Sequence, residues 1–193
     1  MPLTRYVQTV LGYWRAIYDL LRWLREYSIA RKSVYGPYRE KHHGANGRKL
    51  RYSSIVVVLP RRVVLGIPLG IRIIGVCKRG RKEVVREFES LETQLTCRSP
   101  ITVKYDFIYT WQDGVSLSNI GFIQFRAMEN NRYHQAEGWF KVQRRQPLKG
   151  SGSEMQVSFS WTRIMPHELQ TRVGKNSLDS IADIKRFIER EAN

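Results

Sequence analysis

Positively charged side chains are the residues whose type and spacing could support chemistry in this chain, and that chemistry is the binding of phosphate groups. Positions 31–51 contain seven Lys and Arg residues and only one acidic residue. Glycine and proline interrupt the stretch, which predicts a basic loop, although a solvated linker would have the same composition. Tyr35 and Tyr38 are interleaved with the charges and could stack on bases. The expected phosphate contacts are Arg31, Lys32, Arg39, Lys41, Arg48, Lys49 and Arg51.

A second group of cations follows the first apolar runs of the chain. Four cations surround a glycine at positions 78–82, a pattern typical of a turn that presents charge at the end of a hairpin. Together with two arginines after Pro60, they could form a second rim facing an anion. Charged residues at a sheet edge also discourage aggregation, so a solubilising turn is the alternative. The residues concerned are Arg61, Arg62, Lys78, Arg79, Arg81 and Lys82.

The net charge points to the class of partner. The 193 residues carry +16 at pH 7, and residues 1–82 contribute 18 Lys and Arg against three acidic residues. Residues 83–193 are almost neutral, so the excess is concentrated in the first half. Hydrophobic residues make up 42% of the chain, which predicts a folded protein. A basic first half on a folded chain of this length indicates a polyanionic partner.

The clearest predicted element is an amphipathic helix from Thr4 to about Ala30. Apolar residues recur there at alternating spacings of three and four, which places them on one helical face. This face could pack in a core or against a second copy of the chain. Because the helix also carries Trp, Tyr and Arg, the alternative is a helix lying in a membrane interface. The residues of the face are Val7, Val10, Trp14, Ile17, Leu21 and Leu24.

No combination of residues predicts catalysis, a metal site or a cofactor. The chain contains no G-x-S-x-G, H-E-x-x-H, Walker A or G-x-G-x-x-G pattern. His42 and His43 are adjacent and have no nearby cysteine or paired carboxylates, which disfavours a metal site. We therefore expect a non-enzymatic protein without metal or cofactor.

The sequence also bears on the compartment. Two cysteines, Cys77 and Cys97, are too few for a disulfide framework, and the N-terminus does not resemble a secretory signal. No stretch of about 18 uncharged apolar residues is present. We expect an intracellular protein that is soluble or peripheral to a membrane, is not secreted and has no transmembrane span.

The predicted fold is α+β, with a curved antiparallel sheet that could close into a barrel. Alternating apolar residues predict strands at 103–111 and 155–161, with further strands at 55–76, 120–128 and 138–143. A middle helix is expected over 84–95 and a C-terminal helix from an N-cap at Ser177 to about Glu191. The chain then divides into a basic helix and loop segment, 1–53, and a β-rich domain, 54–193.

Three functions remain open at this point. The first is nucleic-acid binding through the basic segment, with RNA favoured because no DNA-recognition motif is present. The second is a structural, self-assembling protein of the matrix type that binds anionic lipid through the N-terminal helix. The third is a sensor of an anionic nucleotide bound in the mouth of the sheet, lined by Tyr105, Tyr109, Trp111 and Trp161. A homo-oligomer through the N-terminal helix is compatible with each.

Overall fold

The computed structural model describes residues 3–43, 49–64, 67–80, 83–96, 100–111, 114, 116–143 and 154–191. A long helix, α1 (Leu3–Val34), precedes ten strands, and α2 (Pro166–Val173) and α3 (Ile181–Glu191) follow them. The strands are β1 (Gly36–His43), β2 (Lys49–Val64), β3 (Ile67–Arg79), β4 (Glu83–Thr96), β5 (Thr102–Trp111), β6 (Ser116–Phe125), β7 (Met128–Glu129), β8 (Arg132–Tyr133), β9 (Gln135–Gln143) and β10 (Glu154–Arg163).

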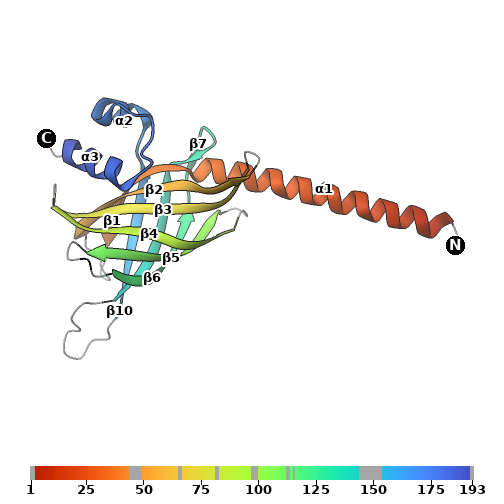
Figure 1. Ribbon diagram of the computed structural model, residues 1–193, viewed down its shortest axis with the longest axis horizontal. Coiled ribbons are helices and arrows are strands. Elements are labelled where there is room, and N and C mark those ends of the chain that lie inside the picture. The colour runs from red at the N-terminus through yellow and green to blue at the C-terminus, as the bar shows by residue number, and fades with distance from the viewer. Residues whose placement is uncertain are drawn as a thin grey trace.

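Eight of the strands form a closed antiparallel barrel, in the order β1-β10-β9-β6-β5-β4-β3-β2. The order follows the chain, except that the small β7–β8 hairpin is inserted between β6 and β9 and that β1 closes the barrel against β10. The α1 helix leaves one end of the barrel and projects away from it, while α2 and α3 lie on the outside (Figure 1). The expected α+β class with a strongly curved antiparallel sheet is confirmed.

Aromatic rings fill most of the barrel lumen. Because side chains alternate across a strand, every second residue of each barrel strand faces inward. Tyr38, Phe125 and Trp161 come from three different strands, and each is at most 1% exposed. Their ring centroids lie between 5.2 and 6.1 Å apart. The lumen at the end nearest α1 is therefore a packed core.

Three glycines make room for other aromatic rings of the lumen, those of Phe88, Tyr105 and Phe159. Each glycine is directly opposite an aromatic residue of the neighbouring strand, and the pairs are Gly75 with Phe88, Gly121 with Tyr105, and Gly138 with Phe159. A Cβ atom on Gly138 would overlap the Phe159 ring and the carbonyl oxygen of Phe122. The absence of a side chain at these positions is thus a packing requirement of the lumen.

The outer face of β2 and β3 carries a second core. Its strand residues are Ile55, Val57, Ile74 and Val76, and its helical residues include Leu169, Ile184, Phe187 and Ile188. The sequence predicts α3, but the helix begins at Ile181, three residues later than the expected N-cap at Ser177 would place it. Ser180 caps it instead, since its Oγ accepts from the Asp183 backbone N–H at 3.1 Å and donates to Asp183 Oδ2 at 3.0 Å. The short helix α2 is not anticipated by the sequence pattern.

The predicted middle helix is wrong, because residues 83–96 form strand β4. Its register shifts between Ser90 and Glu92, so Leu91 is an extra residue that is 41% exposed. The inward residue Phe88 before this bulge is even-numbered and the inward residue Leu95 after it is odd-numbered, because the bulge reverses the alternation. The bulge therefore gives a strand the three- and four-residue spacing of a helix.

The predicted basic loop is also wrong. Residues 36–43 and 49–64 are barrel strands β1 and β2, which pair with each other, and β1 also pairs with β10. The expected domain boundary after residue 53 falls inside β2. Within the described part of the basic segment, residues 36–43 and 49–53 thus belong to the barrel wall, and α1 extends beyond it.

Replacing Gly138 by alanine tests the glycine–aromatic packing. We expect the Gly138→Ala variant to lose about 1–3 kcal/mol of unfolding free energy, because the new methyl group overlaps backbone and ring atoms. Urea denaturation measures the loss. The matched control is Gly12→Ala in α1, where a Cβ atom meets nothing within 4 Å and alanine is the better helix former. A Gly138→Ala variant as stable as this control would contradict the packing argument.

Candidate functional site

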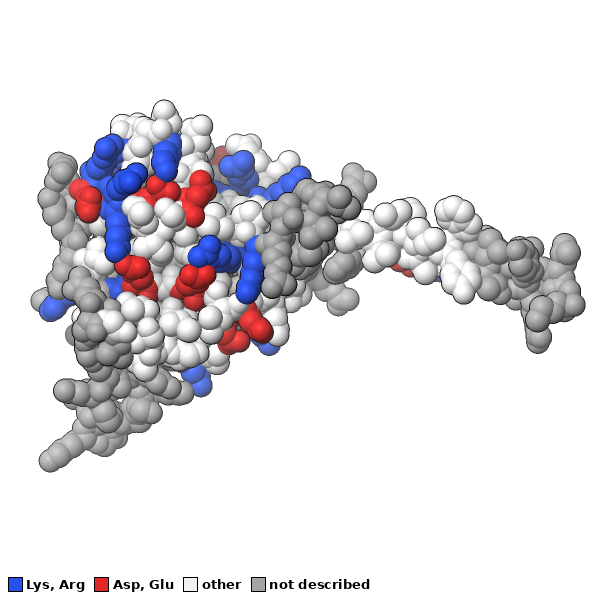
Figure 2. Space-filling model, viewed as in Figure 1, with Lys and Arg blue, Asp and Glu red and all other residues white. Residues whose placement is uncertain are grey.

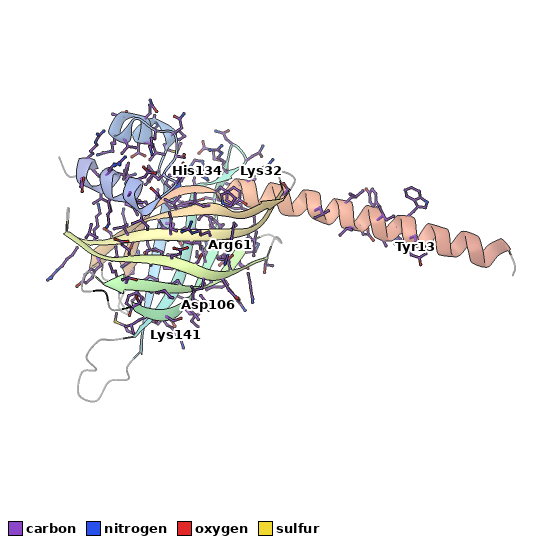
Figure 3. The ribbon with its side chains drawn as sticks, viewed as in Figure 1. Tyr13, Lys32, Arg61, Asp106, His134 and Lys141 are labelled. Atoms are coloured by element: carbon purple, nitrogen blue, oxygen red, sulfur yellow. The ribbon has the colours of Figure 1, made fainter. Side chains whose placement is uncertain are left out.

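The α1 helix exposes a broad apolar and aromatic face. All described side chains between positions 12 and 22 are exposed. Six large apolar ones are between 47 and 69% exposed, namely Tyr13, Trp14, Ile17, Tyr18, Leu20 and Leu21. Tyr13 stands far out on the helix, whereas Lys32 lies where α1 meets the barrel (Figure 3). Nothing in the described part of the chain covers this face.

The exposed residues form one continuous stripe. At 100° per residue they fall within an arc of roughly 160°. The charged residues Arg15, Asp19 and Arg22 lie on the opposite side of the helix by the same geometry. The visible side of the described helix is correspondingly almost free of charged atoms (Figure 2). Three residues of the predicted face lie in this stripe, Trp14, Ile17 and Leu21. Leu24 is partly buried, and the side chains of Val7 and Val10 lie outside the described part.

Contacts with the barrel fix the direction of α1 at its C-terminal end. Arg163 Nη1 donates to the carbonyl oxygen of Ser33 at 3.2 Å, and Nη2 donates to the carbonyl oxygen of Tyr35. The Tyr38 hydroxyl donates to the carbonyl oxygen of Val34 at 2.7 Å. These bonds satisfy carbonyl groups that a helix end leaves without intrahelical partners.

An exposed apolar face of this size indicates an interaction site. Contiguous exposed apolar patches on soluble proteins mark sites of interaction with other proteins or with membranes. Across the part of the chain that the structure describes, no helix has the length and apolarity needed to cross a membrane.

A buried polar cluster lies inside the barrel. Glu40 on β1 is 3% exposed, and both of its carboxylate oxygens accept hydrogen bonds. His42 Nε2 donates to Oε1 at 2.5 Å, and the Trp161 indole N–H donates to Oε2 at 2.7 Å. The Ser54 hydroxyl lies 3.2 Å from His42 Nε2. The cluster therefore ties β1 to both of its neighbours in the barrel.

The ionised form of Glu40 is favoured in this setting. Burial of the carboxyl group by itself raises its pKa. The charge and hydrogen bond of His42, with the hydrogen bonds of Trp161 and Ser54, outweigh burial and lower the pKa of Glu40 below its ordinary 4.5. The lumen thus holds a carboxylate whose charge depends on neighbouring donors.

A small cavity of about 20 Å³ adjoins this cluster. That volume holds about one water molecule. Arg86 lies at its edge, with the guanidinium carbon 5.0 Å from the centroid of the Tyr109 ring. Burial raises the pKa of the neighbouring Cys77 thiol, which disfavours its reactive thiolate. Any ligand larger than water therefore requires the lining side chains to move.

Of the residues predicted to line a nucleotide site, three lie inside the barrel. Tyr105, Tyr109 and Trp161 are at most 5% exposed. Burial, and after it the charge of Glu40, raises the pKa of Tyr105. The Trp111 side chain lies outside the described part. These aromatic residues are thus brought together, but in the interior of the barrel and not at an open mouth.

Among the described residues predicted to bind phosphate, Arg39, Lys41 and Lys78 line one groove of about 340 Å³, but Glu191 lines it too. Arg39 donates to Glu168 at 2.8 Å and to Glu191 at 2.9 Å, and Lys78 donates to Glu191 at 2.9 Å. Lysine and arginine are interspersed with acidic residues on the visible face of the barrel (Figure 2). The charges of Arg39 and Lys78 are therefore partly neutralised by carboxylates of α2 and α3.

The other predicted cations are scattered or lie outside the described part. Arg61 donates to the carbonyl oxygen of Leu91. Lys41 and Arg79 are exposed at the end of the barrel away from α1, whereas Lys32 is exposed where α1 meets the barrel (Figure 3). Residues Arg48, Arg81 and Lys82 are outside the described part, as are the side chains of Arg31, Lys49, Arg51 and Arg62.

The two tyrosines predicted to stack on bases belong to the barrel. Tyr38 is 0% exposed and its ring contacts Trp161, so it is not available on the surface. Tyr35 is partly buried and packs against the lumen core. The prediction of surface stacking is wrong for Tyr38, because β1 turns this side chain into the lumen.

Sequence reasoning missed the buried Glu40–His42 pair. The strand alternation of Tyr38, Glu40 and His42 with Arg39 and Lys41 was the available signal, since it places three residues on one face. The surrounding positive charge and the glycines obscured it.

Comparisons with protein-family models, with curated proteins and with solved structures find no match to this chain.

Replacing Glu40 by glutamine tests the buried cluster. We expect the Glu40→Gln variant to lose about 2–4 kcal/mol of unfolding free energy at pH 7, because one buried donor loses its acceptor. The stabilisation from ionised Glu40 is complete above the unfolded pKa near 4.5 and is lost as the pH falls through the lower folded value. The difference between variant and wild type should therefore shrink below about pH 4.5.

The matched control is Glu89→Gln, because Glu89 also forms an ion pair, with Arg72, but its side chain is 51% exposed. Such exposed pairs contribute at most about 1 kcal/mol. Equal losses of unfolding free energy for the two variants in urea denaturation would contradict a stabilising role of ionised Glu40. A difference between Glu40→Gln and wild type that is constant with pH would contradict it too.

Proposed function

We propose that α1 attaches the barrel to the surface of an anionic membrane and that the protein acts there without catalysis. The observation that carries this proposal is the stripe of six apolar side chains on α1, each at least 47% exposed. Trp and Tyr suit the headgroup layer because one end of each side chain is apolar and the other is polar. A helix with such a face lies in the plane of the interface and buries its apolar side among the acyl chains.

Charge supports lipid over a second copy of α1 as the covering surface. The α1 sequence contains six Lys and Arg residues and two acidic residues. Two copies of α1 carry the same net positive charge and repel each other, whereas each cation near an anionic membrane gains about 1 kcal/mol. The stripe is also wider than the narrow seam that a coiled coil buries.

The second candidate function is the binding of a small anionic nucleotide in the lumen. The observation that favours it is the convergence of Arg86, Glu40 and His42 with aromatic rings inside a barrel that could be wholly apolar. Barrels of eight strands either fill their interior or hold one small ligand. Arg86 would bind the phosphate and the Glu40 carboxylate would accept a hydrogen bond from the base, after the side chains that line the cavity have moved apart.

RNA binding through the basic segment is the remaining alternative. The overall charge of +16 supports it, but the ion pairs of Arg39 and Lys78 and the burial of Tyr38 weaken it. It predicts that the affinity for single-stranded RNA falls strongly with salt and does not change when the apolar stripe of α1 is altered.

Vesicle flotation tests membrane attachment. We expect wild-type protein to float with vesicles that contain phosphatidylserine and much less with phosphatidylcholine alone. Ile17→Asp should reduce the bound fraction by about tenfold or more. It removes an apolar side chain that the membrane would bury, and it adds a negative charge that the anionic lipid repels. The matched control is Ile120→Asp on the outer face of β6, since Ile120 is 46% exposed and Ile17 is 47% exposed.

Equal flotation of the two variants would contradict membrane attachment through α1. Concentration-dependent dimerisation without lipid, lost in Ile17→Asp, would identify a second copy as the partner instead. RNA binding that survives Ile17→Asp in a protein that does not float would favour the nucleic-acid alternative.

Thermal unfolding tests the lumen site. If a nucleoside monophosphate binds only the folded barrel, saturating ligand should raise the melting temperature by several degrees. Arg86→Ala should abolish the shift. The control is Arg126→Ala, which removes the same charge from an exposed ion pair with Glu137 on the outer surface. The absence of any shift, or a shift unaffected by Arg86→Ala, would exclude this site.

A further inference from the structure

An open groove of about 450 Å³ lies where α1 meets the barrel. We call it the junction groove. Its walls come from the last turn of α1, from β1, β2 and β8, and from the segment between α2 and α3. Its lining includes three cations, one acid and several apolar residues, among them Lys32, Arg132, Arg163, Asp179, Leu59 and Leu169. Figure 3 shows Lys32 at this junction.

Arg163 brings a positive charge into this region without a carboxylate to neutralise it. The residue is 6% exposed. Its guanidinium donates to the carbonyl oxygens of Ser33, Tyr35 and Tyr133, with the last bond at 2.8 Å. Backbone carbonyls satisfy the hydrogen bonds of an arginine, but they carry no formal charge. The positive charge of Arg163 therefore remains uncompensated.

The other two cations add to this excess. Lys32 and Arg132 are exposed. Among the described residues, no carboxylate lies within ion-pair distance of Lys32, Arg132 or Arg163. Burial lowers the pKa of Arg163, and the positive charge of Arg132 lowers it further. An anion placed in the groove would relieve this repulsion.

Asp179 does not supply that anion. Its Oδ2 accepts a hydrogen bond from the Ser177 hydroxyl at 2.9 Å, within its own loop. The acid therefore lies in one wall of the groove, and among the described residues it forms no ion pair with the three cations. Apolar residues beside them, including Leu59, would suit the hydrocarbon or glycerol part of a ligand.

We infer that the junction groove binds the phosphate group of an anionic lipid headgroup. Arginine and lysine are the residues that bind phosphate, arginine through paired donors and lysine as a point charge. The groove adjoins the helix proposed to lie in the headgroup layer, so a lipid phosphate is the anion nearest to it. The inference rests on the proposed membrane attachment for its choice of lipid over a soluble phosphate ester.

Paired charge removal tests the groove. We expect Lys32→Ala with Arg132→Ala to weaken binding to vesicles containing phosphatidic acid by about tenfold or more, given the value of each cation near an anionic surface. The matched control removes the same charge at the other end of the barrel, with Lys41→Ala and Arg79→Ala, two exposed residues. This control should change binding by less than about threefold. Glycerol phosphate in solution provides a second arm, read as a shift in melting temperature.

The outcomes separate the two proposals. Wild type that binds vesicles, with the groove and control variants weakened equally, overturns the groove and leaves membrane attachment standing. Wild type that fails to bind vesicles overturns membrane attachment; glycerol phosphate that then stabilises wild type but not the groove variant would keep a phosphate site and reject the lipid. No vesicle binding and no stabilisation would overturn both proposals.

Discussion

Strand β1 hydrogen-bonds to β2 on one side and to β10 on the other, and this pairing closes the barrel. Closure removes the free sheet edges and creates an inside. It also sets the direction of every side chain on β1. Tyr38 and Glu40 enter the lumen, where Glu40 accepts from the Trp161 indole of β10. Arg39 points outward to the C-terminal helices, where it meets Glu168 and Glu191.

Closure also explains why the charge asymmetry of the sequence is much weaker in space. Residues 1–82 carry nearly all of the net charge of +16. The antiparallel barrel places the basic strands next to acidic residues from later in the chain, such as Glu89 beside Arg72 and Glu191 beside Lys78. The exposed members of these pairs contribute little to stability. Their consequence is electrostatic, since they reduce the positive field available to an outside polyanion.

The sequence was most informative where one periodicity dominated. Strand β5 alternates without interruption, and the apolar faces of α1 and α3 repeat at helical spacing, so type and approximate position were predictable. Strand β4 was not predictable, because the exposed bulge residue Leu91 lies between the inward residues Phe88 and Leu95 and gives the three apolar residues a helical spacing. The basic run failed for a different reason. Its glycines and charges favour a loop locally, and pairing with β2 and with the distant strand β10 makes residues 36–43 a strand.

The candidate sites also differ in how far apart their residues lie in the chain. The apolar face of α1 depends on local spacing and was visible in the sequence. The bond from Trp161 to Glu40 and the junction groove depend on residues far apart in the chain, such as Arg163 beside Ser33. No local pattern brings such residues together, so they emerge only once the barrel is closed.

The central claim is that the α1 stripe is uncovered in the free protein and becomes covered by anionic lipid. Hydrogen–deuterium exchange of the α1 amides, with and without phosphatidylserine vesicles, tests it most directly. We predict rapid exchange over residues 12–22 in solution, because this segment has no tertiary cover, and marked slowing on vesicles while the barrel amides stay unchanged. Exchange in α1 that is unaffected by vesicles, or that is already slow without them, would contradict the account.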